Sequence, residues 1–463
     1  MKFLFNIRGL IASLININYS LFLTLFGVLG LTFVTGAGAG MPIQQWSLNS
    51  GAKVYLISTP NLPMLDLQID FDAGSRRDPA QQTGLSSAFA MMMSKGVLAS
   101  AKRAALDENQ LGEAWADLGA SFMASSSQDR FSFRLRTLTE PAILGEAIEL
   151  AAQQIARPSF DSKIFVRERD KAVAGLKESL TQPGTLAGRA FAKALYADHP
   201  YGALVTQESL LGTQSSDLQT FYKRYVTPCS ARISMVGNVS RERATQIAEL
   251  LMSQFEQPSS CSVLAPITRV KFLEKATEER IAFDSAQAHV LIGAPAIDRA
   301  DPDYFPLTVG NYVLGGGGFV SRLTEQVREK RGLSYSVYSY FAPGKQEGPF
   351  TIGLQTRPDQ ALQALTLSRE ILTEYVKNGP TPKELKAAKD NLIGGFPLRL
   401  DSNKKLLDNL ANIAWNDLPL SYLDTWVSAV ERVSIQDIKL AFQKHVHPGA
   451  MATVIVGGKF ETR

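Results

Sequence analysis

The sequence predicts an α+β protein made of two duplicated domains, each a mostly antiparallel sheet packed against helices. The first observation is that both halves of the 463-residue chain end in a helix, a proline, an apolar strand and a glycine. The two prolines, Pro228 and Pro448, stand about 220 positions apart. The second observation is that Pro158 and Pro380, each between two expected helices, have nearly the same separation. One α+β unit therefore occurs twice.

The third observation is the alternation of apolar and polar residues in the first half. Residues 65–71 read Leu-Asp-Leu-Gln-Ile-Asp-Phe, which is typical of a half-buried strand. Phe131, Phe133 and Leu135 alternate in the same way. In chain order we expect strands at 53–58 and 65–71, helices near 84–95 and 107–118, a strand through 131–135, helices at about 140–156 and 161–181, and a closing strand at 231–236.

In the second half, Thr381, Pro382 and Glu384 form a helix start, with Thr381 as N-cap and Glu384 closing a capping box. The second closing strand is expected at 452–456, followed by Gly457. The polar, Pro/Ser-rich stretch that begins at Glu256 is the expected linker. We thus expect an N-terminal domain at 45–255, a linker at 256–277 and a C-terminal domain at 278–463.

Composition excludes several classes of function. The chain has 48 basic and 44 acidic residues, a net charge of +4 and no dense basic run, so nucleic acid is not an expected partner. Only two cysteines occur, Cys229 and Cys261, which excludes a disulfide-built scaffold and leaves their pairing open. The four histidines are too scattered to predict a zinc site with a nearby carboxylate. The spacing of His445 and His447 could bind metal, but beside Pro448 the two are expected in a solvated turn.

The N-terminus carries the features of a secretory signal peptide at residues 1–39. Lys2 and Arg8 precede an apolar run at 21–34, and small residues around Ala39 suit cleavage. We therefore expect an exported, periplasmic protein. The alternative is an uncleaved anchor, and only in that case is contact with a membrane expected.

The strongest motif spans residues 312–337 and joins a run of four glycines, Gly315 to Gly318, to a segment with charged residues and then to a strand pattern. No Lys-Ser or Lys-Thr pair follows the glycines, so a nucleotide site is not indicated. In order and spacing this segment resembles the C-terminal domain of the pitrilysin/insulinase family of zinc peptidases, in the form built from half-size subunits. The resemblance extends over about residues 45–460.

The resemblance implies that the two domains form one half-shell of a peptide chamber, which a second half-shell closes. In the family, one half-shell carries zinc and the opposite one contributes an arginine and a tyrosine seven positions apart, which Arg328 and Tyr335 match. A guanidinium and a phenol are suitable donors to the negative charge of the transition state. Gly332 is expected to end the helix that carries Arg328 in a left-handed conformation, so that helix-borne Arg328 and strand-borne Tyr335 can converge. The resemblance also makes Gly316 and Gly317 candidates for substrate binding.

The same resemblance exposes a degenerate zinc site. The family's H-x-x-E-H helix corresponds to residues 84–96, where Ser87, Ala90 and Met91 replace both histidines and the glutamate. The family's third ligand corresponds to Glu168, which alone will not retain zinc and is expected to be a solvated helix residue. Where catalytic relatives carry an Asn-Ala pair on the substrate-binding edge strand, this chain has Met123 and Ala124. No cofactor is expected in this chain, and zinc is expected in a partner subunit.

Two functions follow from the resemblance. The first is a non-catalytic subunit of a heteromeric zinc metallopeptidase, inactive alone, whose Arg328 and Tyr335 complete the active site of a homologous zinc-bearing subunit that hydrolyses peptides. The second is a non-enzymatic peptide-binding or scaffold protein of the same fold. Activity in a mixture of the two chains, and its dependence on Arg328, distinguishes them.

Overall fold

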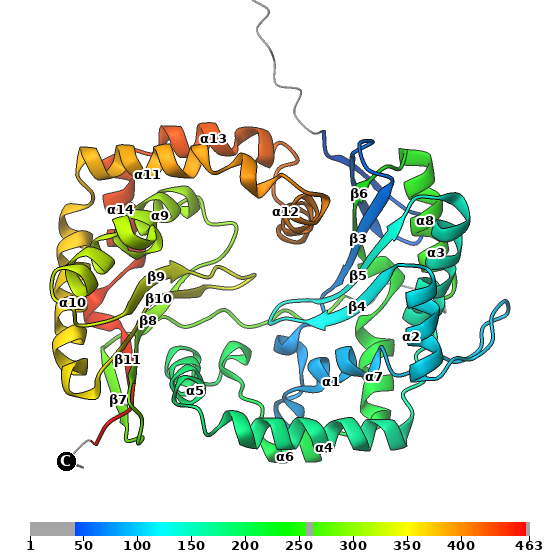
Figure 1. Cartoon of the computed structure of the whole chain (residues 1–463), viewed down its shortest axis with the longest axis horizontal. Coiled ribbons are helices and arrows are strands. Elements are labelled where there is room, and N and C mark those ends of the chain that lie inside the picture. Colours follow the sequence, from blue (N-terminus) through cyan, green and yellow to red (C-terminus); the bar gives the residue numbers. More distant parts are fainter. Residues whose placement is uncertain (1–41, 256–262, 460–463) are drawn as a thin grey trace, which may run out of the picture. The chain divides into compact units, whose positions relative to one another are not determined.

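The computed structural model describes residues 42–255 and 263–459. The first half contains a six-stranded sheet in the order β1-β2-β6-β3-β5-β4 (Figure 1). All neighbouring pairs are antiparallel except β2 and β6. The alternation at 65–71 does form a strand, but both of its faces are buried rather than one, and the phenylalanines of β5 pack in the core of this half. The strands are β1 (Gln44–Ser47), β2 (Lys53–Ser58), β3 (Met64–Phe71), β4 (Ser121–Ser126), β5 (Phe131–Leu138) and β6 (Arg232–Gly237).

The second half contains a five-stranded sheet in the order β7-β11-β8-β10-β9. Only β7 and β11 pair in parallel. If the strands are numbered along the chain within each half, starting at β2 and at β7, both sheets have the spatial order 1-5-2-4-3. The shared order confirms the duplication. The strands are β7 (Thr277–Ile281), β8 (Ala288–Ile297), β9 (Ser336–Phe341), β10 (Gly348–Thr356) and β11 (Ala452–Val456).

The four helices whose ranges were expected in the first half occur within a few residues of those ranges, as α1 to α4, whereas α5, α6 and α8 were not expected. Their boundaries follow capping residues: Asp107 forms a capping box before α2, and the Asp161 carboxylate accepts two backbone N–H bonds before α4. The helices are α1 (Leu85–Met92), α2 (Glu108–Asp117), α3 (Pro141–Ala156), α4 (Ser162–Ser179), α5 (Pro183–Tyr196), α6 (Gln207–Leu211), α7 (Ser215–Tyr225) and α8 (Arg241–Ser253).

The second half contains the capping box expected at Thr381. The Glu384 N–H donates to Thr381 Oγ1 at 3.2 Å, and the Thr381 N–H donates to the Glu384 carboxylate at 2.7 Å. Two π-helical segments, Tyr312–Gly316 and Thr324–Glu329, interrupt the region of the glycine run. The α-helices are α9 (Tyr304–Asn311), α10 (Ala361–Asn378), α11 (Pro382–Gly394), α12 (Asn403–Asn416), α13 (Tyr422–Arg432) and α14 (Ile435–His445).

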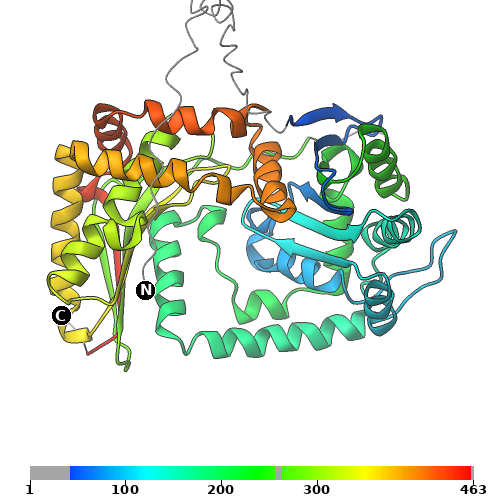
Figure 2. The same ribbon diagram turned by 45° about the horizontal axis from the view of Figure 1, so that its top comes forward.

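The two halves exchange one helix each. Helix α12, from the second half, packs on β2, β3 and β6 of the first sheet, where the fully buried Leu410 joins a cluster with Ile57 and Val236. Helix α5, from the first half, packs on β8 and β11 of the second sheet, and its Phe191 joins a cluster with Val454. The same neighbours lie together in Figures 1 and 2. Each core is therefore completed by the other half of the chain.

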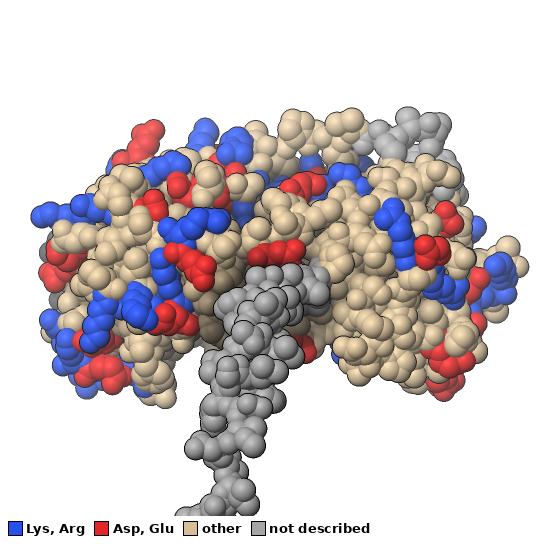
Figure 3. Space-filling view, turned by 90° about the horizontal axis from the view of Figure 1, so that it is seen from above, with Lys and Arg blue, Asp and Glu red and all other residues tan. Residues whose placement is uncertain are grey.

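The described part of the expected linker, residues 263–277, contains no helix, and of its residues only Thr277 lies in a strand, as the first residue of β7. Basic and acidic side chains are interspersed on the face shown in Figure 3. Among the described residues, no helix combines the length and the apolar character needed to cross a bilayer. The expected signal peptide at 1–39 and Cys261 lie outside the described residues.

Candidate functional site

Arg328 and Tyr335 lie together, as the sequence predicts. The Arg328 guanidinium carbon is 4.7 Å from the centroid of the Tyr335 ring and 4.7 Å from that of Phe319. Both rings are exposed, Tyr335 to 78% and Phe319 to 68%. The three side chains line a surface pocket of about 200 Å³ together with Gly318 and Ser336. The guanidinium also pairs with the carboxylate of the neighbouring Glu329 at 3.2 Å, so two rings and one carboxylate contact it.

The backbone explains this convergence. Arg328 lies in the π-helical segment, and the Gly332 N–H donates to the Arg328 carbonyl at 2.9 Å. Gly332 has φ +60°, the left-handed conformation expected from the sequence. The Leu333 N–H then donates to the Val327 carbonyl at 2.9 Å and its side chain is buried, which anchors the turn. Tyr335 is one residue before β9, rather than within the strand as expected.

The glycine run allows close packing beside this site. A Cβ atom on Gly315 would lie 2.4 Å from Ser339 Oγ of β9, and one on Gly317 would lie 2.6 Å from the Tyr312 carbonyl oxygen. A Cβ on Gly316 would meet the Asn311 side chain at 2.7 Å. Gly318 lines the Arg328 pocket, whereas Gly316 and Gly317 do not. The described geometry thus gives the run a packing role.

The positions that correspond to zinc ligands lie on α1 beside an apolar pocket. Ser87 and Met91, one turn apart, line a cavity of about 370 Å³ between α1, α4 and the region of α6. Ala90 is partly buried against the core of the first half. A hydroxyl, a methyl group and a thioether do not supply the imidazole and carboxylate ligands of a peptidase zinc site.

The expectation that Glu168 is solvated is wrong. Its side chain is only 9% exposed, because Arg167 and Lys171 donate to it at 2.7 and 2.9 Å. The Lys95 ammonium lies 3.9 Å from its other oxygen and also pairs with Glu108. The hydrogen bond from Lys171, then that from Arg167, lowers the pKa of Glu168. The carboxylate that corresponds to the third zinc ligand is neutralised by three side-chain cations.

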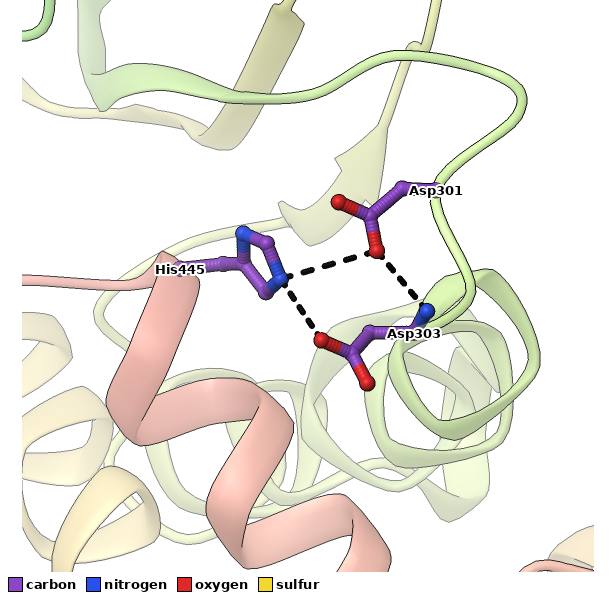
Figure 4. A group of neighbouring side chains, drawn as sticks. All are labelled: Asp301, Asp303 and His445. Atoms are coloured by element: carbon purple, nitrogen blue, oxygen red, sulfur yellow. Dashed lines mark hydrogen bonds and ion pairs between the residues drawn. The ribbon is translucent and has the colours of Figure 1, made fainter.

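The expectation for His445 is also wrong. This histidine ends α14 with its side chain 9% exposed, and its Nε2 lies 2.9 Å from Asp303 and 3.7 Å from Asp301 (Figure 4). Among the described residues, these three form the one group of His, Cys, Asp or Glu side chains close enough to share a metal ion. The Lys444 ammonium also contacts Asp303 at 2.7 Å, so the cluster is already an ion-paired link between α14 and the start of α9. His447 is exposed.

A half-buried carboxylate fixes the start of α1. Asp78 accepts hydrogen bonds from the Gly84 N–H at 2.8 Å and from the Ser86 N–H at 2.9 Å. Burial raises the pKa of Asp78 to about 6, against the opposing effect of these bonds. The helix that corresponds to the zinc helix is therefore held by a carboxyl group that titrates in the mildly acidic range.

Comparison with known proteins places this geometry in a family. Residues 53–208 match the family Insulinase (Peptidase family M16), and residues 214–392 match the Peptidase M16 inactive domain. A crystal structure of a peptidase M16 inactive domain from Pseudomonas fluorescens is 32% identical, with a TM-score of 0.84, over 91% of this chain and 99% of that one. The chain belongs to the M16 insulinase family.

M16 relatives with similar sequences differ in the activity that their names state. The uncharacterized zinc protease YmxG of Bacillus subtilis is 26% identical over 90% of this chain and 99% of its own length. The non-peptidase homolog YmxG of Helicobacter pylori is 26% identical over 88% of this chain and 93% of its own length. With Ser87, Ala90 and Met91 at the ligand positions, this chain is an inactive M16 homologue.

Sequence reasoning missed two side chains that shape these sites. Phe319 supplies the second aromatic face against Arg328, and Lys95 supplies an ammonium beside Glu168. Phe319 directly follows the glycine run, and Lys95 is one turn after Met91, so both stood beside recognised motifs. A search for partners of Arg328 and Glu168 within those motifs could have found them.

Proposed function

We propose that this chain is the non-catalytic subunit of a heteromeric zinc metallopeptidase. Its Arg328 and Tyr335 bind the scissile carbonyl of a peptide in an active site whose zinc is held by a separate homologous chain. The observation that carries this proposal is the contrast between the two sites: the Arg328 and Tyr335 side chains converge on an exposed pocket, while the zinc-ligand positions are occupied by groups that do not bind zinc.

The chemistry of the pair supports this role. The guanidinium and the phenol are hydrogen-bond donors, and negative charge develops on the carbonyl oxygen during metal-assisted hydrolysis. Contact of the guanidinium with the rings of Phe319 and Tyr335 supports the proposal, because a side chain that is already in place loses less entropy when it binds substrate. Zinc and the attacking water would come entirely from the partner.

The test mixes the mature chain with a candidate zinc-bearing homologue and measures hydrolysis of a quenched fluorescent peptide library, with each chain alone as baseline. Activity should appear only in the mixture. Arg328→Ala should lower it by about 10²–10³-fold, as the loss of one oxyanion donor does. Arg331→Ala, which removes a nearby exposed charge, should leave it unchanged. Stoichiometric zinc in the isolated chain would contradict the proposal.

The name of the Helicobacter pylori relative, a non-peptidase homolog, favours a second candidate function. Under this candidate function the chain is a non-enzymatic peptide-binding or scaffold protein, and Arg328 takes no part in catalysis. No gain in hydrolysis on mixing, with assembly intact by size-exclusion chromatography, would favour this candidate.

We also propose export to the periplasm. The basic residues Lys2 and Arg8, the apolar run at 21–34 and the small residues near Ala39 support it. Sequencing the N-terminus of the protein recovered from a periplasmic fraction should show cleavage near Ala39. An intact N-terminus in the membrane fraction would instead support the anchored form.

A further inference from the structure

The apolar pocket beside α1 has a lining that suits a ligand body without polar groups. Its walls include Met91, Phe165, Leu176, Val205 and Leu210. Two of its hydroxyl groups are already used: the Ser179 hydroxyl donates to the Leu176 carbonyl and the Thr213 hydroxyl to the Ser209 carbonyl, both at 2.8 Å. A peptide would bring an amide group with every residue and find few partners here, which costs free energy. An alkyl chain would not.

The pocket is large enough for such a chain. Its volume is about 370 Å³, and it opens to solvent. An apolar cavity of about 150 Å³ accepts one benzene molecule, so by proportion this pocket holds on the order of a dozen carbon atoms. A single amino-acid side chain would leave much of it empty, and empty apolar volume is unfavourable.

One charge borders this apolar space. Arg169 is the one ionisable residue in the pocket lining, and within the described part of the chain its guanidinium pairs only with the neighbouring Asp170, at 3.3 and 3.4 Å. Asp170 is 61% exposed and can be replaced as a partner at little cost. By contrast, Arg167 on the same helix is bound by two carboxylates at 2.6 and 2.7 Å. Arg169 is therefore available to an incoming anion.

We propose that this pocket binds an amphipathic monocarboxylate with an unbranched alkyl chain of about a dozen carbons, the chain among the apolar side chains and the carboxylate on Arg169. The site lies on the α1 face where the family's metal centre would be, and it uses Ser87 and Met91 as wall residues. This inference does not depend on the proposed role of Arg328, because the two sites share no residue.

The test is titration calorimetry of the full mature chain with sodium dodecanoate below its micelle concentration. One saturable site per chain is expected. Across a series from octanoate to hexadecanoate, affinity should rise by up to about fourfold per methylene and level off when the pocket is full. Dodecanol should bind about tenfold more weakly than dodecanoate, since it lacks the charge.

Two variants and matched controls localise the binding. Gly175→Leu fills the pocket from α4, where a Cβ atom meets nothing within 4 Å and leucine improves helix propensity, so the fold should be retained. It should lower affinity at least tenfold, whereas Gly188→Leu, in an equally open position on α5, should not. Arg169→Gln should lower dodecanoate affinity about tenfold without affecting dodecanol, and Lys177→Gln on the same helix should change neither.

Absence of saturable binding, or equal binding by Gly175→Leu and the unmodified chain, would overturn the proposal. Tighter binding of an apolar tetrapeptide with a free C-terminal carboxylate than of dodecanoate would also overturn it, since the pocket would then be a peptide site. Peptidase activity of the mixed complex is measured separately, so failure here leaves the proposed function untouched.

Discussion

Substitution of Leu410 by alanine tests whether the exchanged helix α12 holds the first sheet together. Leu410 is fully buried against Ile57 and Val236. The change removes three buried carbon atoms, about 2.4 kcal/mol of transfer free energy at about 0.8 kcal/mol per methylene, and leaves a cavity that adds to the loss. We expect the free energy of unfolding to fall by about 3–4 kcal/mol, measured by urea denaturation.

The location of the damage is as informative as its size. Amide hydrogen exchange should accelerate in β2 and β6, strands that precede the substitution by more than 150 positions in sequence. The control is Leu440→Ala on α14, whose side chain is 54% exposed and whose loss should cost less than about 0.5 kcal/mol. Equal stability of the two variants, or faster exchange confined to the second half, would refute the reasoning.

Three further predictions concern the sites. Folding raises the pKa of Asp78 to about 6, so the ionised carboxylate opposes folding, and its protonation at lower pH removes this cost. Relative to Asp78→Asn, the unmodified chain should therefore gain about 2 kcal/mol of unfolding free energy between pH 7 and pH 4, measured by urea titration. A difference between the two chains that does not change with pH would contradict this. Gly315→Ala should cost about 1–3 kcal/mol in the same assay, because its Cβ would overlap Ser339; an unchanged urea midpoint would exclude that overlap. Lys95→Met should lower thermal stability by about 1 kcal/mol, since it removes a cation beside the buried Glu168; increased stability would show that the ammonium is not needed there.

Local features of the sequence predicted most of the fold. The alternation at 65–71, the capping box at Thr381 and the left-handed Gly332 each depend on a few neighbouring residues, and all three occur in the structure. The convergence of Arg328 with Tyr335 was predicted from the family resemblance, which singles out this pair, and their spacing alone would not have shown it. The repeated proline spacing predicted the duplication.

Contacts between distant segments could not be predicted. The amphipathic pattern of α12 shows which face is apolar but not that the sheet it covers belongs to the other half. Burial of Glu168 depends partly on Lys95, 73 positions earlier, and the link from His445 to Asp303 spans 142 positions. Sequence spacing carries no information about such pairs until the topology is known.

The helix exchange constrains the order in which the chain can fold during synthesis. The first sheet is complete in sequence at Gly237, but one of its faces lacks a cover until residue 416 has emerged. During that interval, apolar side chains of β2 and β6 are open to solvent, a condition that promotes aggregation. The first half therefore has to be kept from misassociation, for example by a chaperone, while the 179 residues from 238 to 416 are being made.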